Sequence, residues 1–392
     1  MSKNAKIVVA IIIALIVIFA LAKWQKHDKN EYSSGNKSDT KMAAGETYKI
    51  GVLLPLTGDA ASYGEPGQKV LQMAVDELNN NGSMGSNKLK LIFEDAKCNG
   101  KDATAAAQKL VNVDSVQIII GGFCSSESLA AVPVAEKQKV AIFSIGSSSP
   151  KLTGVSSYFF RIFPSDASQG SLDAEIANEK GYKTVAFIQE QQDYTLGIYQ
   201  AFTKRFEELG GKTIKEEFAP GTADFKTQLT KLRGQKPDAL FIDAQASAGD
   251  GRILKQLKDL GWQPKLFINE ALAGDTAVIA ENKSSLEGAI GAEFTVDPSN
   301  SKFKHLIDSY KQKYGAELPY QSYGQTEYDS IYLVKDGLMA VGYNGEKFAQ
   351  WSRTIKNWEG ASGKLSIKPD GDRESGYSPE IVKDGKMVPY TE

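Results

Sequence analysis

Short apolar runs rich in β-branched residues alternate with amphipathic segments along most of the chain, and this alternation constrains the fold most. The runs of the first half are Lys49–Leu54, Leu89–Glu94, Val116–Ile120 and Val140–Phe143, and those of the second half are Thr184–Ile188, Thr213–Phe218, Ala239–Asp243 and Leu266–Ile268. Runs of this kind indicate strands covered on both faces. Strand–helix–strand alternation predicts parallel sheets with right-handed crossovers, so we expect an α/β protein with two doubly wound lobes.

Amphipathic helices are predicted between these strands. Leu71, Ala74, Val75 and Leu78 follow helical spacing, and Asn80-Asn81-Gly82 should end that helix. Asp224 is placed to cap a helix over Phe225–Arg233. Because ligands of such sheets collect beyond the carboxyl ends of the strands, two facing lobes would hold a site in the cleft between them.

The N-terminus places the rest of the chain outside the cytoplasm. Residues 7–22 form an unbroken apolar run of sixteen, preceded by Lys3 and Lys6. The run fits a cleavable secretory signal or an uncleaved membrane anchor, although a helix of this length spans only about 24 Å of a roughly 30 Å hydrocarbon core. Residues 23–47 are polar and are expected to form a flexible linker, so the folded domain should cover residues 48–392.

Composition argues against several classes of function. The 46 basic and 48 acidic residues leave a net charge of −2 without a basic stripe, so nucleic acid is not an expected partner. Two histidines and two cysteines are too few for a His-rich metal site. The chain lacks a Gly-x-Ser-x-Gly motif, and His305 stands alone in a helical stretch, where we expect a surface residue. We therefore expect no enzyme, no catalytic residue, no metal and no cofactor.

Cys98 and Cys124 are the only cysteines. In a chain expected to lie outside the cytoplasm they predict a disulfide, and two buried free thiols are the alternative. Both follow predicted strands, so both should lie at the same edge of one sheet.

Serine-rich segments follow two neighbouring predicted strands. Ser125 and Ser126 open a helical segment, where free backbone N–H groups and hydroxyls suit a carboxylate. Residues 144–149 form the second segment. Ordinary capping and turn chemistry explains either segment alone, but their occurrence at adjacent strand ends favours an anion pocket.

Several motifs occur in an order and spacing that carry a resemblance: Gly51–Gly58 with Tyr63-Gly64, Asp95–Cys98, Gly122–Ser126, Phe160–Asp166, Pro220–Phe225 with Lys236–Ala239, Glu327–Ser330 and Lys364–Gly371. From Tyr48 to Tyr390 the chain resembles the type I periplasmic solute-binding proteins of the leucine/isoleucine/valine-binding branch of ABC importers. The resemblance implies an N-lobe of about residues 48–164 and 296–362, a C-lobe of about 165–295 and 363–392, and hinges near Pro164–Asp166, Glu293–Val296 and in the last thirty residues.

The resemblance also implies a ligand-binding set. It comprises Ser125 and Ser148 as carboxylate-binding hydroxyls, Gly146 as a backbone acceptor for the ammonium, the adjacent Ser147, Tyr63 and Tyr194 as cleft-lining aromatics, and Glu270 as the acid that neutralises the ammonium. A surface carboxylate is the alternative for Glu270. The family often has Pro-Ala-Ala-Thr where this chain has Ile145-Gly146-Ser147-Ser148, and Gln245–Ser247 lacks the tyrosine of the leucine binders, so a more polar pocket wall is expected.

The implied function is the extracytoplasmic substrate-binding subunit of an ABC importer, located in the periplasm or on the outer face of the cytoplasmic membrane. We expect a monomer whose lobes close on a free amino acid of the branched-chain or a related type and which is read by permease subunits in the membrane. The alternative is a sensor or receptor domain of the same fold for an amino acid, an amide or another small organic solute.

Overall fold

The computed structural model describes residues 44–391, which belong to one compact unit. The apolar run at residues 7–22 and most of the expected linker at 23–47 lie outside the described residues. Within residues 44–391, no helix combines the length and apolar character needed to cross a membrane.

The N-lobe is built on a parallel sheet of five strands in the order β2-β1-β3-β4-β5. Its strands are β1 (Thr47–Leu54), β2 (Lys88–Asp95), β3 (Ile118–Ile120), β4 (Ala141–Ser144) and β5 (Phe159–Arg161). The four strands predicted in this half are confirmed, with ends that differ by at most about two residues, as is common for element boundaries.

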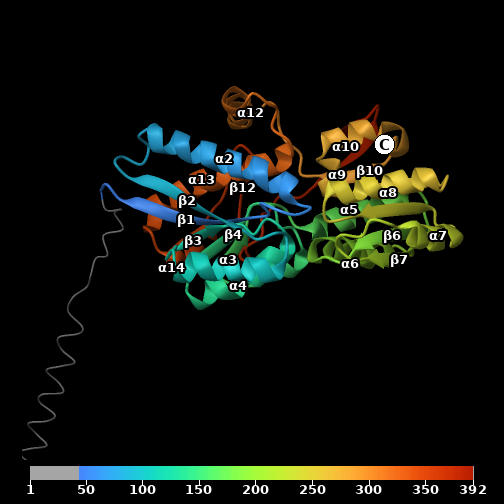
Figure 1. Ribbon diagram of the computed structural model, residues 1–392, viewed down its shortest axis with the longest axis horizontal. Coiled ribbons are helices and arrows are strands. Elements are labelled where there is room, and N and C mark those ends of the chain that lie inside the picture. The colour runs from blue at the N-terminus through green and yellow to red at the C-terminus, as the bar shows by residue number, and fades with distance from the viewer. Residues whose placement is uncertain (1–43, 392) are drawn as a thin grey trace, which may run out of the picture. The chain divides into compact units, whose positions relative to one another are not determined.

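Helices cover both faces of the N-lobe sheet (Figure 1). The helices of this lobe are α2 (Ala61–Asn80), α3 (Gly100–Asn112), α4 (Ser125–Lys137), α12 (Ser301–Tyr314), α13 (Gln321–Val341) and α14 (Gly345–Ser352). Alternate β1 side chains point to opposite sides: Val52 packs in a core with α2 and α13, whereas Leu53 packs with α3 and α4. The short 3₁₀ helix Pro150–Leu152 and the hairpin β11 (Trp358–Gly360) and β12 (Gly363–Leu365) complete the lobe.

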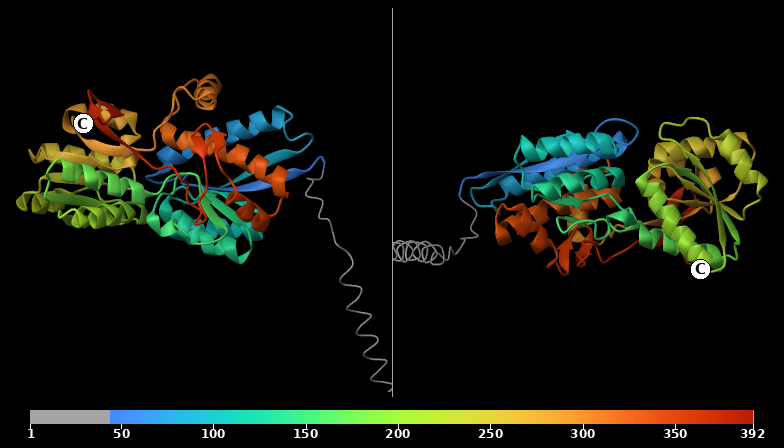
Figure 2. Two further views of the ribbon diagram at one scale, coloured as in Figure 1. Left: turned by 180° about the vertical axis from the view of Figure 1, so that it is seen from behind. Right: turned by 90° about the horizontal axis from the view of Figure 1, so that it is seen from below.

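The C-lobe is built on a seven-stranded sheet in the order β14-β13-β10-β9-β8-β6-β7. Its strands are β6 (Thr184–Glu190), β7 (Lys212–Phe218), β8 (Ala239–Asp243), β9 (Lys265–Ile268), β10 (Ile290–Glu293), β13 (Ser378–Lys383) and β14 (Lys386–Pro389). The four strands predicted in this half are confirmed. The sheet is parallel from β10 to β7, and the last two strands join it antiparallel, so the C-terminus lies on this lobe (Figure 2).

The C-lobe helices also lie on both faces of their sheet. They are α5 (Asp166–Glu179), α6 (Asp193–Glu208), α7 (Lys226–Gly234), α8 (Ser247–Asp259), α9 (Glu270–Ala273), α10 (Thr276–Glu281) and α11 (Lys283–Leu286). Phe187 of β6 packs in a core with α5 and α6, whereas Ile188 packs with α7 and α8. Helix α7 begins one residue later than predicted, and the Asp224 carboxylate accepts the Lys226 N–H at 3.0 Å.

Three segments connect the lobes: β5 to α5, β10 to α12, and the segment before β13. The chain stays with the N-lobe beyond residue 362, where we expected it to leave. Strand β12 pairs with β11, and the buried Arg161 forms an ion pair with Asp372 at 2.7 Å between Nε and Oδ1. Only the segment after Arg373 continues into the C-lobe sheet, so the third connection begins later than the resemblance implied.

Candidate functional site

A small cavity lies between the lobes, and both lobes contribute to its wall. The N-lobe supplies Tyr63, Phe123, Cys124, Ser125, Gly146, Ser148 and Tyr323, and the C-lobe supplies Tyr194, Gln245, Glu270 and Ala271. Strands β3, β4, β8 and β9 end next to these residues, as the rule for parallel sheets predicts. Six of the seven residues expected to bind a ligand therefore line one cavity.

The two serine-rich segments are fastened to one another on the N-lobe wall. Ser125 is the first residue of α4, and its hydroxyl accepts the backbone N–H of Ser149 at 3.1 Å. An accepting hydroxyl keeps its own proton available for a further partner. Ser125 and Ser148 are almost fully buried.

Ser147 is the exception among the predicted residues. Its side chain does not line the cavity, because it points towards the loop at residues 122–124. Its hydroxyl contacts the carbonyl oxygens of Gly122 at 2.7 Å and Cys124 at 3.0 Å, and the Ser128 hydroxyl at 2.8 Å. Ser147 therefore holds the two serine-rich segments together and has no free hydroxyl to offer a ligand, which corrects its assignment to the ligand-binding set.

Cys98 and Cys124 form a disulfide, as predicted, with 5.3 Å between their Cα atoms. The buried Glu127 lies beneath it. Its carboxylate accepts the backbone N–H groups of Cys98 at 2.7 Å and Cys124 at 3.0 Å. Burial raises the pKa of Glu127 to about 7, against the lowering effect of these hydrogen bonds. The strand ends that carry the two cysteines are thus joined both covalently and through one carboxyl.

Glu270 supplies the acidic group of the C-lobe wall. It follows β9 and opens α9, where the Asn269 side chain caps the helix by accepting the Leu272 N–H at 3.0 Å. Glu270 is only 1% exposed, so the alternative of a surface carboxylate is wrong. Burial raises its pKa to about 8, the hydroxyl of Tyr323 lowers it, and the like charge of Asp166 raises it further.

Tyr323, which sequence reasoning missed, contacts Glu270 from the opposite lobe. Its hydroxyl donates to both carboxylate oxygens, at 2.8 and 2.6 Å. A second contact across the cleft runs from the backbone N–H of Ser247 to the Tyr63 hydroxyl at 3.1 Å. The remaining cavity has a volume of about 10 Å³, which is room for about one water molecule. Side chains therefore almost fill the cleft, and the hydroxyl of Tyr323 is hydrogen-bonded to its acidic group, Glu270.

A sequence model of the periplasmic binding proteins matches residues 47–377, which is most of the chain. The chain belongs to the periplasmic binding protein family. Proteins of this family are extracytoplasmic solute-binding proteins, so the resemblance predicted from the motifs is confirmed, as is the two-lobed α/β fold.

Known relatives cover most of this periplasmic binding protein. A leucine-, isoleucine-, valine-, threonine- and alanine-binding protein of Pseudomonas aeruginosa is 27% identical over 335 residues, which cover 84% of this chain and 88% of the relative. The crystal structure of a leucine-binding protein from Thermotoga maritima has a TM-score of 0.79 at 28% identity and covers 88% of this chain and 98% of its own. A solute-binding protein from R. palustris in complex with benzoate shares the fold, with a TM-score of 0.78 at 19% identity and coverage of 88% and 95%.

Another buried acid, Asp166, lies next to the cavity-lining Ser148 of this periplasmic binding protein. Asp166, the first residue of α5, donates its backbone N–H to the Ser148 carbonyl at 2.9 Å, and its carboxylate accepts from Tyr377 at 3.1 Å. Burial raises the pKa of Asp166 to about 7, while the Ser148 hydroxyl and Arg161 lower it. Asp166 lies at the first crossing between the lobes. There it contacts Ser148 of the N-lobe wall and raises the pKa of Glu270 of the C-lobe wall.

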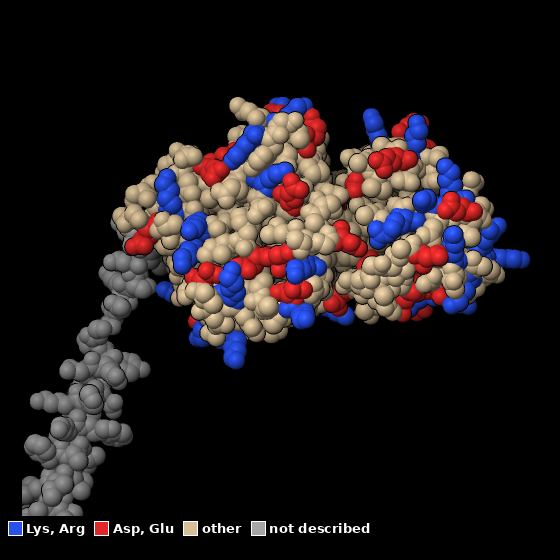
Figure 3. Space-filling model, viewed as in Figure 1, with Lys and Arg blue, Asp and Glu red and all other residues tan. Residues whose placement is uncertain are grey.

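Other features lie away from the cavity. His305 is a surface residue of α12, as predicted, with its side chain 57% exposed beside Glu77. Basic and acidic side chains are interspersed over the face of the molecule shown in Figure 3.

Proposed function

We propose that this protein is the substrate-binding subunit of an ABC importer and that it captures a free α-amino acid between its lobes. The observation that carries the proposal is the division of the site. The hydroxyls of Ser125 and Ser148 lie on the N-lobe wall, and the carboxylate of Glu270 lies on the C-lobe wall. A zwitterion needs hydrogen-bond donors for its carboxylate and an anionic acceptor for its ammonium, because neither charge is stable in a buried site without a partner.

The carboxylate of the amino acid would bind at the start of α4. This helix has thirteen residues, and its N-terminal end places a partial positive charge and free N–H groups beside Ser125. The Ser125 hydroxyl would donate to the carboxylate, the Ser148 hydroxyl would join it by turning from Asp166, and the Gly146 carbonyl would accept from the ammonium. The buried Glu127 lies under the same turn but is turned towards the cysteine N–H groups, so it leaves this end of the cavity to an anion.

The ammonium would take the place that the Tyr323 hydroxyl occupies on Glu270. The Tyr323 hydroxyl is a neutral donor, whereas the ammonium adds a positive charge beside the carboxylate, so the exchange favours the ligand once the cleft has opened to admit it. Tyr63 and Tyr194 would line the cleft around the aliphatic part of the ligand. A ligand shifts the balance between open and closed cleft only by its different affinity for the two states, and a site divided between lobes supplies that difference.

The importer role also assigns the partners. Permease subunits in the membrane would recognise the closed, loaded form of a monomeric binding protein that performs no chemistry on its ligand. Residues 7–22 would deliver the protein across the membrane or retain it on the outer face. The segments near Pro164–Asp166 and Glu293–Val296 and the segment after Arg373 would absorb the closing motion.

Calorimetry of the purified full-length protein against the common amino acids tests the proposal. At least one α-amino acid should bind, and Glu270→Gln should weaken that binding about 100-fold, the factor that corresponds to about 3 kcal/mol for removing one partner of a buried charge pair. Glu208→Gln, which changes an exposed carboxylate at the end of α6 away from the cavity, is the control and should leave the binding unchanged. The absence of heat with every α-amino acid would overturn the proposal.

An aromatic carboxylate is the second candidate ligand, because Tyr63, Phe123 and Tyr323 pack as mutually contacting rings at the cavity. A benzoate lacks the ammonium that Glu270 would neutralise. If benzoate is the ligand, it should bind in the same assay and Glu270→Gln should leave its affinity unchanged or increase it, which separates the two candidates.

A further inference from the structure

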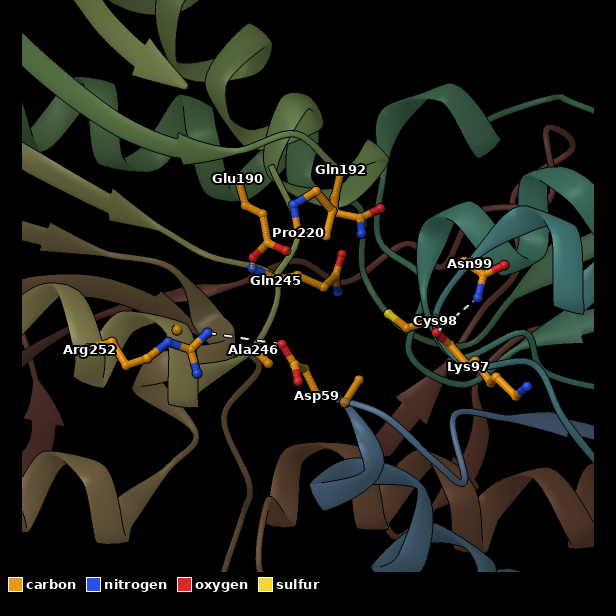
Figure 4. Close-up of a pocket in the computed structure, with 12 residues that line it drawn as sticks. Asp59, Lys97, Cys98, Asn99, Glu190, Gln192, Pro220, Gln245, Ala246 and Arg252 are labelled. Atoms are coloured by element: carbon orange, nitrogen blue, oxygen red, sulfur yellow. Dashed lines mark hydrogen bonds and ion pairs between the residues drawn. The ribbon is translucent and has the colours of Figure 1, made fainter. Parts of the chain in front are cut away.

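A larger pocket opens between the lobes just outside the small cavity, with a volume of about 280 Å³ (Figure 4). We call it the outer pocket. Its wall includes Asp59, Lys97 and Cys98 of the N-lobe and Glu190, Gln245 and Arg252 of the C-lobe. Nothing in the amino-acid site described above uses these charged side chains.

Gln245 and the disulfide separate the outer pocket from the inner cavity. Cys124 and Gln245 line the inner cavity, whereas Cys98 and the same Gln245 line the outer pocket. The Gln245 amide nitrogen lies 3.9 Å from the Cys124 sulfur, so one side chain and one disulfide form the boundary. Gln245 is only partly buried and lies between β8 and α8, so its side chain is not held within a strand or helix.

The inner side of the outer pocket is acidic. Glu190 ends β6, and its carboxylate accepts the backbone N–H of Gln245 at 2.9 Å. The positive charges of the pocket have acidic partners of their own. Lys97 lies 3.5 Å from Asp102, and Arg252 lies 4.0 Å from Asp59, both at partly exposed positions.

Further carboxyls lie behind Glu190. Asp243 and Asp250 are fully buried, and one carboxyl oxygen of each has no hydrogen-bond partner among the described residues. Burial and the neighbouring acids raise the pKa of all three groups, while Arg252 lowers the pKa of Glu190 and Asp250. Three carboxyls therefore share the influence of one guanidinium, Arg252, which also pairs with Asp59, and a second cation placed there would relieve the remaining repulsion.

We propose that the outer pocket receives the distal end of the bound amino acid's side chain, and that Glu190 selects an α-amino acid whose long side chain ends in a positive charge. The inference rests on the proposed function. The inner cavity would hold the α-carboxylate and α-ammonium, and the side chain would pass between Gln245 and the disulfide. An ammonium or guanidinium at its end would donate a charge-assisted hydrogen bond to Glu190, whereas an aliphatic end would cover that carboxylate without adding a hydrogen bond or a charge.

Lysine and norleucine test this inference directly, because they have side chains of the same carbon length and differ in the terminal ammonium. In calorimetry with the full-length wild-type protein, lysine should bind about tenfold or more tightly than norleucine. In Glu190→Gln the two affinities should become similar. Glu208→Gln, which changes an exposed carboxylate at the end of α6, is the matched control and should keep the wild-type preference.

The comparison of the two ligands in the wild-type protein needs no variant, so it remains decisive if Glu190→Gln does not fold. Norleucine or leucine binding as tightly as lysine to the wild-type protein would overturn the inference and leave the proposed function intact. Unchanged lysine preference in a folded Glu190→Gln protein would also overturn it. If no α-amino acid binds, the proposed function fails as well.

Discussion

The hydroxyl of Tyr323 on one lobe donates to both carboxylate oxygens of Glu270 on the other, at 2.8 and 2.6 Å. Both side chains are buried, and the contact crosses the cleft that a ligand must enter. The acidic group of the C-lobe wall is thus satisfied from the opposite lobe. Under the proposed function the ammonium would have to displace this hydroxyl, so Tyr323 would compete with the ligand for Glu270.

Tyr323→Phe should strengthen binding of the cognate amino acid by about three- to tenfold, because the competing hydroxyl is removed while the ring remains. The same change should lower the free energy of unfolding of the ligand-free protein by about 1–3 kcal/mol, since Glu270 loses its partner. Calorimetry and urea unfolding measure the two effects. Weaker binding would instead mean that the Tyr323 hydroxyl contacts the ligand.

The ligand-free protein should become less stable as the pH rises from about 5 to about 8. Burial raises the pKa of Glu127 and Asp166 to about 7 and of Glu270 and Glu327 to about 8. In this interval the unfolded chain has released protons that the folded chain still binds, so the stability falls until the pH passes the folded-state pKa of each group. Urea unfolding at pH 5, 6, 7 and 8 measures the slope, and Glu327→Gln should reduce it. Stability that increases over this interval would contradict the prediction.

Amino-acid binding should strengthen over the same pH interval. The ammonium requires an ionised Glu270, and ligand-free Glu270 has a pKa of about 8, so binding below that pH releases a proton. Calorimetry in buffers of different ionisation enthalpy counts the released proton. Affinity that is constant from pH 6 to 8 would show that Glu270 is already ionised in the empty cleft.

Reduction of the disulfide, or the double change Cys98→Ser with Cys124→Ser, should lower the free energy of unfolding by about 3–4 kcal/mol. The bond closes a loop with a sequence separation of 26, and cross-links of this size restrict the unfolded chain by about that amount. Urea unfolding with and without reductant measures the difference. Glu127 still accepts both cysteine N–H groups after reduction, so the folded protein should keep its ability to bind ligand.

Gly146→Ala should destabilise the protein by about 1–3 kcal/mol and weaken ligand binding. A Cβ atom at this position would lie 2.9 Å from two ring atoms of Phe123, so the ring has to move and the loop between β4 and the 3₁₀ helix moves with it. Thermal unfolding and calorimetry measure both effects. The double change Gly146→Ala with Phe123→Leu should recover stability, and failure to do so would locate the strain elsewhere.

The strands could be predicted because their signal is local. A run such as Ala239–Asp243 is apolar, β-branched and short, and it forms β8 with the same bounds. The meeting of the two serine-rich segments followed from the rule that parallel strands end at one edge, which needs only the order of the elements along the chain. The disulfide followed from the presence of only two cysteines in a chain expected to lie outside the cytoplasm.

The rest depended on contacts between distant segments. Ser147 and Ser148 are adjacent and chemically identical, and only their directions separate a loop contact from a cavity wall. Tyr323 reaches Glu270 from a helix far along the chain, and no spacing in the sequence links the two. The third connection begins later than expected, because Asp372 pairs with Arg161 and this contact keeps the chain on the N-lobe beyond residue 362.

The Arg161–Asp372 ion pair also bears on how the two lobes can move relative to one another. Arg161 stands just before the first connection and Asp372 just before the third, and both are buried in the N-lobe. Two of the three connections to the C-lobe therefore start from one buried ion pair in the N-lobe. We expect opening of the cleft to rotate the C-lobe about that pair, with the Glu293–Val296 connection following the motion.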